Sequence, residues 1–170
     1  MHAFHKIAFL CGLIGAIASP VAAADLTPIK QEATTANYRL ELQIGPTEKM
    51  FTAADVAAQH PADGEVMVRG KMSMATGGMS MDMGDTRHLE VHVYALDSGT
   101  VVTNAHVAIA VTGANPKKVE DVSVAKMYGI KEGPPDTHYG NDVSLPPGSY
   151  SIEVTVNREK ADFMVVIPAS

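Results

Sequence analysis

Cysteine and tryptophan are almost absent from this chain of 170 residues, which contains one cysteine, Cys11, and no tryptophan. A single cysteine cannot form a disulfide within the chain, so disulfides cannot hold the fold together. Aromatic residues make up only 5% of the sequence. The hydrophobic core must therefore be built mainly from valine, isoleucine, leucine and alanine, and the chain is long enough for one domain with such a core.

Runs of lysine and arginine are also absent, and the formal net charge is −6. The lack of a basic patch argues against nucleic acid as a partner. The sequence contains no G-x-S-x-G, no His-Glu-x-x-His and no phosphate-binding glycine loop. We therefore expect a protein that is not an enzyme, although redox cycling of a bound copper or iron ion would be compatible with the sequence.

The first 24 residues have the pattern of a signal peptide. A positively charged start is followed by the apolar segment Ile7–Ala18 and by an A-x-A cleavage site at Ala22 and Ala24. The apolar segment is shorter than the roughly 20 residues that span a bilayer. We expect export to the periplasm as a soluble protein, with residues 25–37 as a leader or linker and residues 38–170 as a single domain.

Alternation of apolar and polar residues with period two dominates the rest of the chain and predicts β-strands. Thr52–Asp55 resembles a capping box and predicts one short helix. Tyr150, directly after a Pro-Gly turn, resembles a tyrosine corner. The pattern predicts an all-β fold, an immunoglobulin-like antiparallel β-sandwich with little helix. The predicted strands are 38–44, 65–69, 88–94, 104–111, 119–128, 149–156 and 161–167.

Methionine is concentrated in one short stretch. Six of the ten methionines lie between Met67 and Met83, and a Gly/Ser/Asp-rich loop, residues 72–85, contains most of them. This loop has almost no other apolar residue with which to form a core. Because the thioether is a soft ligand that selects Cu(I), the loop indicates a metal-handling protein and favours copper, with Met81 and Met83 as candidate ligands.

The segment His88–Tyr94 predicts a strand with histidines on its polar face. His88, Glu90 and His92 share this face, and the apolar residues between them face the core. Residues four apart on a strand are about 13 Å apart, whereas same-face neighbours are about 7 Å apart. His88 and Glu90 can therefore bind one ion between them. An isolated histidine on such a face is usually only solvated, but three polar ligands beside a methionine-rich loop favour a metal site.

His106 is a further candidate whose position depends on the turn at residues 97–99. A three-residue hairpin loop would place His106 opposite His92, whereas a two-residue loop would place it opposite Val91 on the other face. His138 lies in the Gly/Pro-rich segment 133–142, which we predict to be a loop. It is either a ligand or a turn residue bonded to a backbone carbonyl. The sequence leaves two roles open for Met127, packing in the core or binding the metal.

Several of these residues also carry a family resemblance. His88-Leu89-Glu90, Met127, His138-Tyr139-Gly140-Asn141 and the strand start Gly148-Ser149-Tyr150 resemble the periplasmic iron-transport accessory proteins of the Tpd type. Members of that family are dimeric immunoglobulin-like proteins that work beside an iron permease of the high-affinity ferrous class. The resemblance implies His88, Met127 and His138 as copper ligands, Glu90 close to the ion, iron bound nearby, and a homodimer. It covers about half of the expected mature chain.

Three features depart from the family pattern. The hairpin Asn157–Lys160 is short and lacks the histidine that is the family's fourth ligand, extra residues separate Met127 from His138, and the methionine-rich loop precedes His88. We expect one of four residues to replace the missing ligand: Met81, Met83, His92 or His106.

The sequence therefore predicts a periplasmic copper-binding protein, with iron as a second candidate ion. We expect it to assist high-affinity metal uptake beside an inner-membrane iron permease. The alternative is a copper chaperone or copper-tolerance protein that delivers Cu(I) to a copper-receiving protein. A third interpretation is a structural β-sandwich that binds no metal.

Overall fold

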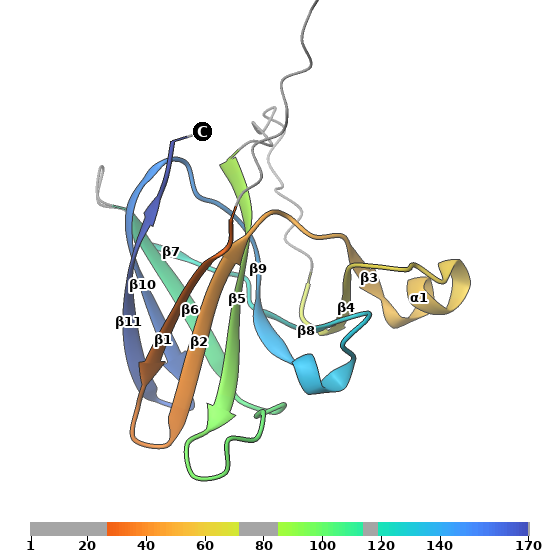
Figure 1. Cartoon of the computed structure of the whole chain (residues 1–170), viewed down its shortest axis with the longest axis horizontal. Helices are drawn as coiled ribbons and strands as arrows, with labels where there is room; N and C mark the ends of the chain where they lie inside the picture. Colours follow the sequence, from red (N-terminus) through yellow and green to blue (C-terminus); the bar gives the residue numbers. More distant parts are fainter. Residues whose placement is uncertain (1–26, 72–84, 114–118, 170) are drawn as a thin grey trace, which may run out of the picture.

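The computed structural model describes residues 27–71, 85–113 and 119–169, which form two β-sheets packed face to face (Figure 1). The seven-stranded sheet has the order β1 (Ile29–Thr34), β2 (Tyr38–Gly45), β5 (Thr86–Ala95), β9 (His138–Ser144), β8 (Ala125–Gly129), β4 (Glu65–Arg69) and β3 (Met50–Thr52). The four-stranded sheet has the order β11 (Glu159–Ile167), β10 (Gly148–Val156), β6 (Val107–Gly113) and β7 (Val119–Asp121). The predicted all-β sandwich is confirmed, and its immunoglobulin-like character stays a prediction.

The core lies between the two sheets and is aliphatic, as the shortage of aromatic residues requires. Leu89, Val91 and Val93 of β5 have no exposed surface, and the facing strands β10 and β11 contribute residues such as Val154 and Phe163. Because successive side chains of a strand point to opposite faces, the polar residues of β5 lie on the outer face of the seven-stranded sheet. This outer face carries the candidate site.

The predicted short helix is confirmed as α1 (Ala53–Gln59), which follows β3. The Thr52 hydroxyl accepts a hydrogen bond from the Asp55 backbone N–H at 3.1 Å, and the Asp55 carboxylate accepts one from the Thr52 N–H at 3.0 Å. This is the capping box that the sequence indicates. The hydroxyl of Tyr150 donates to the Pro146 carbonyl at 2.8 Å, as a tyrosine corner requires.

Two predictions about where strands lie along the chain are wrong. The predicted linker 25–37 contains β1, which pairs with β2 along its whole length and has alternate residues half-buried. The sequence signal for this strand was the alternation of Ile29, Gln31 and Ala33 with the more exposed residues between them. The predicted strand 119–128 is two strands, because β7 belongs to the four-stranded sheet and β8 to the seven-stranded sheet.

The predicted loop 133–142 is also wrong, and this correction matters most for the site. Residues Pro134–Asp136 form a short 3-10 helix, η2, and His138–Ser144 form β9 in the interior of the sheet. Glycine, asparagine and aspartate are poor strand formers, so the local sequence conceals this strand. It forms because β5 and β8 pair with it on either side and because Tyr139 is buried in the core.

The expected signal peptide and almost all of the methionine-rich loop lie outside the described residues. Within the described part of the chain, no helix is long and apolar enough to cross a membrane.

Candidate metal centre

The outer face of the seven-stranded sheet brings together side chains from three strands. His88 and Glu90 come from β5, His138 from β9 and Glu65 from β4. The pairing of β5 with β9 sets His92 opposite His138 and His88 opposite Asp142, and residues directly opposite each other share a face. Three segments far apart in the sequence, β4, β5 and β9, thus contribute to one place on this face. In the sheet, β9 runs between β5 and β8, and β4 follows β8 (Figure 1).

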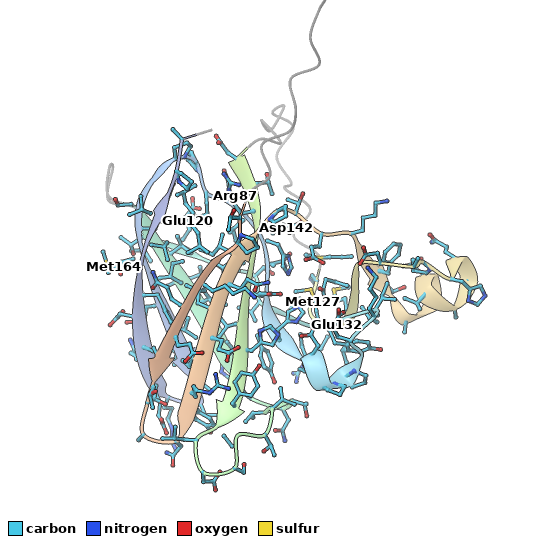
Figure 2. All side chains as sticks on the ribbon, in the orientation of Figure 1. Arg87, Glu120, Met127, Glu132, Asp142 and Met164 are labelled. Atoms are coloured by element: carbon cyan, nitrogen blue, oxygen red, sulfur yellow. The ribbon has the colours of Figure 1, made fainter. Side chains whose placement is uncertain are left out.

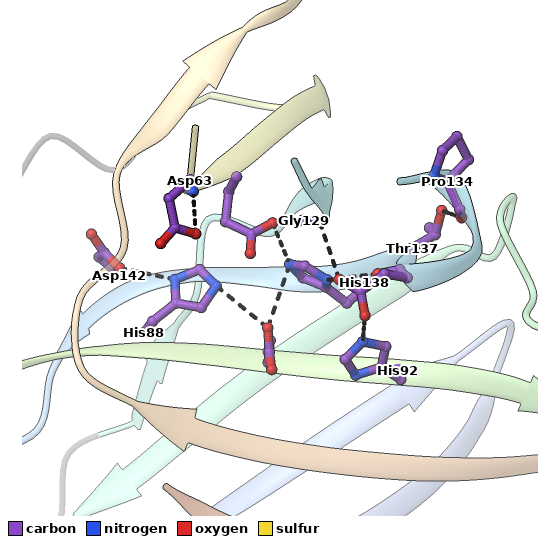
Figure 3. Close-up of polar contacts among 12 residues, drawn as sticks. Asp63, His88, His92, Gly129, Pro134, Thr137, His138 and Asp142 are labelled. Carbon is purple, nitrogen blue, oxygen red and sulfur yellow. Dashed lines mark hydrogen bonds and ion pairs between the residues drawn. The ribbon is translucent and has the colours of Figure 1, made fainter. Parts of the chain in front are cut away.

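Four of these side chains bring their ligand atoms to a common position. Figure 3 labels the two histidines among them, His88 and His138. The Nε2 atom of His138 lies 3.2 Å from Oε2 of Glu65 and 3.5 Å from Oε2 of Glu90. The Nε2 atom of His88 lies 3.7 Å from the same Glu90 oxygen. All four residues are at most 5% exposed, and one ligand atom from each lies within 4.8 Å of the others.

Three of the inward-facing atoms lack a hydrogen-bond partner in the described structure. They are Oε2 of Glu65, Nε2 of His88 and Nε2 of His138. A buried polar atom without a partner costs about 1–3 kcal/mol, and one metal ion bound between these three atoms would satisfy all of them. Two imidazole nitrogens and two carboxylate oxygens form a donor set that suits Cu(II), iron or zinc. These residues therefore fit a transition-metal ion.

The other nitrogen of each ligand histidine is held by a hydrogen-bonding group. Nδ1 of His88 lies 3.0 Å from a carboxylate oxygen of Asp142, and Nδ1 of His138 lies 2.9 Å from the backbone carbonyl of Asp136. An imidazole whose Nδ1–H donates to such an acceptor presents the lone pair of Nε2 to the ion. Metal-binding histidines are usually oriented in this way, so the support around the site is already in place.

The carboxylates also set the protonation of His138. Burial lowers the pKa of its imidazole, but the carboxylates of Glu65 and Glu90 raise it more strongly, and the pKa reaches about 9. Glu48, close to Glu65, has its pKa raised by burial and by the neighbouring carboxylates. Positive charge is therefore favoured at this position, and a proton on His138 supplies it without a metal ion.

This raised pKa predicts that metal affinity depends on pH. Since His138 keeps its proton up to about pH 9, an ion that binds Nε2 must displace that proton. The apparent affinity should rise about tenfold between pH 7 and pH 8, because one proton is released for each ion bound. Titration against a competing chelator at both pH values, corrected for the protonation of the chelator, measures this slope. An affinity that does not change would show that His138 is already neutral.

The structure places the other predicted ligands at different distances from this cluster. The ring of His92 lies 5.1 Å from that of His138, between centroids, and Nε2 of His92 lies 3.1 Å from a carboxylate oxygen of Asp136. Met127, fully buried in β8, is directly opposite His138, and Met67 of β4 is directly opposite Met127. These two histidines and two methionines form one row across β5, β9, β8 and β4.

His106 does not join the site. Neither of the two predicted pairings with β5 occurs, because the chain forms only a short bridge between Tyr94 and Val101 and then crosses to the four-stranded sheet. His106 is exposed there, and its backbone N–H donates to the side chain of Asn157 at 2.9 Å. Met81 and Met83 lie outside the described residues.

Three members of the site were not predicted from the sequence: Glu65, Asp136 and Asp142. Glu65 is the first residue of a strand, directly after a turn at Gly64, and its burial at 4% exposure was not expected. Its only signal was its position two residues before Met67 on the same strand face. Asp136 lies just before β9 and Asp142 lies within it. Because this segment was predicted as a loop, their positions could not be inferred.

Comparison of the chain with protein-family models, with curated protein sequences and with solved structures gives no match.

Proposed function

We propose that this protein binds a single transition-metal ion, copper first and iron second, between Glu65, His88, Glu90 and His138. In this proposal it is a periplasmic protein that holds the ion for uptake by a membrane permease, and it is not an enzyme. One observation carries the proposal: four buried ligand atoms within 4.8 Å of one another come from three strands, and three of these side chains carry an atom that has no hydrogen-bond partner among the described residues.

Copper is the first candidate because hard and soft ligands are close together. The nitrogen and carboxylate donors suit Cu(II) or iron, whereas thioethers suit Cu(I). Met127 lies on the same sheet face as His138 and is its direct cross-strand neighbour. Figure 2 shows Met127 on the side of the seven-stranded sheet that faces away from β10 and β11, with Met164 on the far side of the molecule. A site with both donor types nearby could hold copper in either oxidation state.

A copper chaperone is the second candidate function, favoured by the methionine-rich segment between Met72 and Met83. Its sequence supplies five thioethers that could hand Cu(I) to a receiving protein. Deletion of residues 72–83 separates the two candidates. Cu(I) affinity that survives the deletion supports binding at the strand cluster for uptake, whereas its loss supports the chaperone.

Metal analysis of the purified chain from Asp25 onward tests the proposal. The protein is incubated separately with Cu(II), Cu(I) under reducing conditions, Fe(II) and Zn(II), desalted, and analysed for metal by mass spectrometry. We expect one copper ion per chain and retention of copper in a mixture of the four. Retention of iron over copper would make iron the cargo. A chain that retains none of these ions would contradict the proposal and support a structural β-sandwich.

A further inference from the structure

A cavity of about 660 Å³ lies on the outer face of the seven-stranded sheet, beside the metal cluster. Two of the proposed ligands, Glu65 and Glu90, form part of its wall, as do His92 and Asp136. The two other ligands, His88 and His138, do not line it among the described residues. The cavity therefore reaches the carboxylate side of the cluster while the imidazoles lie deeper.

The wall of this cavity is strongly acidic. Eight carboxylates and two lysines line it. Lys131 pairs with Asp63 at 3.0 Å, and Arg39 pairs with Glu41. Among the described residues, no lysine or arginine forms a direct ion pair with Glu48 or Glu132, although Lys131 interacts with both at longer range. The two ligand carboxylates form ion pairs there only with histidines. An excess of negative charge thus remains at the inner part of the cavity.

Acidic lining alone does not make a binding site, but a buried atom links this cavity to the cluster. Glu65 is 4% exposed and lines the cavity, and its Oε2 atom lies at an ion-pair distance of 3.2 Å from Nε2 of His138. Among the described residues this oxygen accepts no hydrogen bond. This carboxylate therefore belongs both to the cavity wall and to the ligand set. An ion in the cavity can reach the cluster through it without crossing the sheet.

A second group of ligand atoms lies between the cavity and the buried cluster. His92, Asp136 and His138 offer ligand atoms within 4.8 Å of one another. The side chains of His92 and Asp136 are 13% and 29% exposed, whereas that of His138 is 1% exposed. His138 belongs to both groups. An ion held at His92 and Asp136 would therefore be one imidazole away from the buried position.

We propose that the buried site is loaded from this acidic cavity by a hydrated metal cation, which first meets His92 and Asp136 and then passes to His138. Metal held in an anionic complex, such as a citrate complex, is excluded by the same charges. This inference rests on the proposed function and defines its substrate as the free cation. His92 and Glu132 act on the rate of loading, not on the final ligand set.

The physical reason is electrostatic focusing. A cavity lined by charges of one sign, with low-dielectric walls, raises the local concentration of the opposite ion and its rate of association by about 10- to 1,000-fold. Salt screens this effect, since the Debye length falls from about 30 Å at 0.01 M to about 8 Å at 0.15 M ionic strength. A residue that only relays the ion, such as His92, changes the loading and release rates by the same factor, so its removal leaves the equilibrium affinity little changed. Removal of a charge that attracts the ion, such as that of Glu132, lowers the loading rate and the affinity together.

Stopped-flow measurement of Cu(II) binding to the chain from Asp25 onward tests the loading route, with quenching of tyrosine fluorescence as the signal. The variants are Glu132→Gln, Lys131→Gln and His92→Phe, with Asp162→Asn as the matched control. Asp162 is an exposed carboxylate on β11, in the other sheet. Equilibrium affinity is measured in parallel by chelator competition. A further series supplies copper as its citrate complex at matched free Cu(II).

We expect the loading rate of the unchanged chain to fall at least about tenfold between 0.01 M and 0.15 M salt. Glu132→Gln should slow loading about threefold and Lys131→Gln should accelerate it about threefold, whereas Asp162→Asn leaves it unchanged. His92→Phe should lower loading and release together with little change in affinity. Added citrate complex should contribute nothing to the rate.

Other results separate this inference from the proposed function. Copper that binds with the same rate in all variants and at all salt concentrations would overturn the loading route and leave the proposed function standing. A loading rate that rises with the concentration of the citrate complex would show that anionic complexes enter the cavity. That result would overturn the inference. A chain that binds no copper at equilibrium would overturn both.

Discussion

Replacement of His138 by alanine is expected to abolish measurable copper binding. His138 lies 3.2 Å from Glu65 and 3.5 Å from Glu90, and its second nitrogen is held by the Asp136 carbonyl. Loss of a hydrogen-bonding group behind a metal ligand already lowers affinity about 10- to 100-fold, so loss of the ligand itself should cost more than about 100-fold. Chelator competition with the purified variant measures this change.

Two controls keep this result interpretable. His106→Ala removes an exposed imidazole just before β6, a strand of the other sheet, and should leave affinity unchanged. Asp142→Asn keeps all four ligands and weakens only the support of His88, so its affinity should fall between those of His138→Ala and the unchanged chain. Circular dichroism checks that each variant folds. A folded His138→Ala variant with undiminished affinity would place the ion elsewhere.

Substitution of Gly140 by alanine should disrupt both the sheet and the site. Gly140 lies opposite Glu90 in the pairing of β5 with β9, between His138 and Asp142. A Cβ atom at this position would overlap with the Leu89 carbonyl oxygen and lie 2.9 Å from the Cα of Glu90. Since both obstacles are backbone, β5 must move away from β9. We expect a loss of about 3–5 kcal/mol in the free energy of unfolding, measured by denaturant titration.

Gly45→Ala is the matched control for this substitution. Gly45 lies in β2 opposite His88, in the same sheet and on the same face as Gly140, and a Cβ atom there would meet no described atom within 4 Å. Its stability should change by less than about 1 kcal/mol. A Gly140→Ala variant as stable as Gly45→Ala would show that β5 and β9 are not as close as the structure has them. Loss of copper binding in Gly140→Ala alone would confirm that their register builds the site.

The two faces of β5 could be predicted because they depend only on local alternation. Leu89 and Val91 are apolar and His88 and Glu90 are polar, and the strand period of two assigns them to opposite faces. The position of His138 could not be predicted in the same way. It depends on the pairing of β9 with β5, which joins segments about 50 residues apart, and β9 is rich in residues that disfavour strands. His138 was a candidate ligand because of its Gly/Pro-rich segment and a short resemblance, and neither of these revealed the strand that contains it.

The methionine-rich segment was the most conspicuous feature of the sequence, but the site that the structure describes is built mainly from other residues. Glu65 was missed because a single glutamate at a strand start has no distinguishing pattern. Its burial depends on the pairing of β4 with β8 and of β8 with β9. This pairing cannot be read from the sequence around Glu65. Prediction therefore succeeded for features that repeat along the chain and failed for those that depend on contacts between distant strands.

The convergence of β4, β5 and β9 has a consequence for how the chain is held together. The single cysteine excludes an intrachain disulfide, yet an ion bound by Glu65, Glu90 and His138 would tie three distant segments at one point. Such an ion is a reversible cross-link, which closes two long loops as a disulfide would. By mass action, free metal at about 1,000 times the dissociation constant would add about 4 kcal/mol to the stability of the fold. Release of the cargo would then also loosen the sheet that holds it.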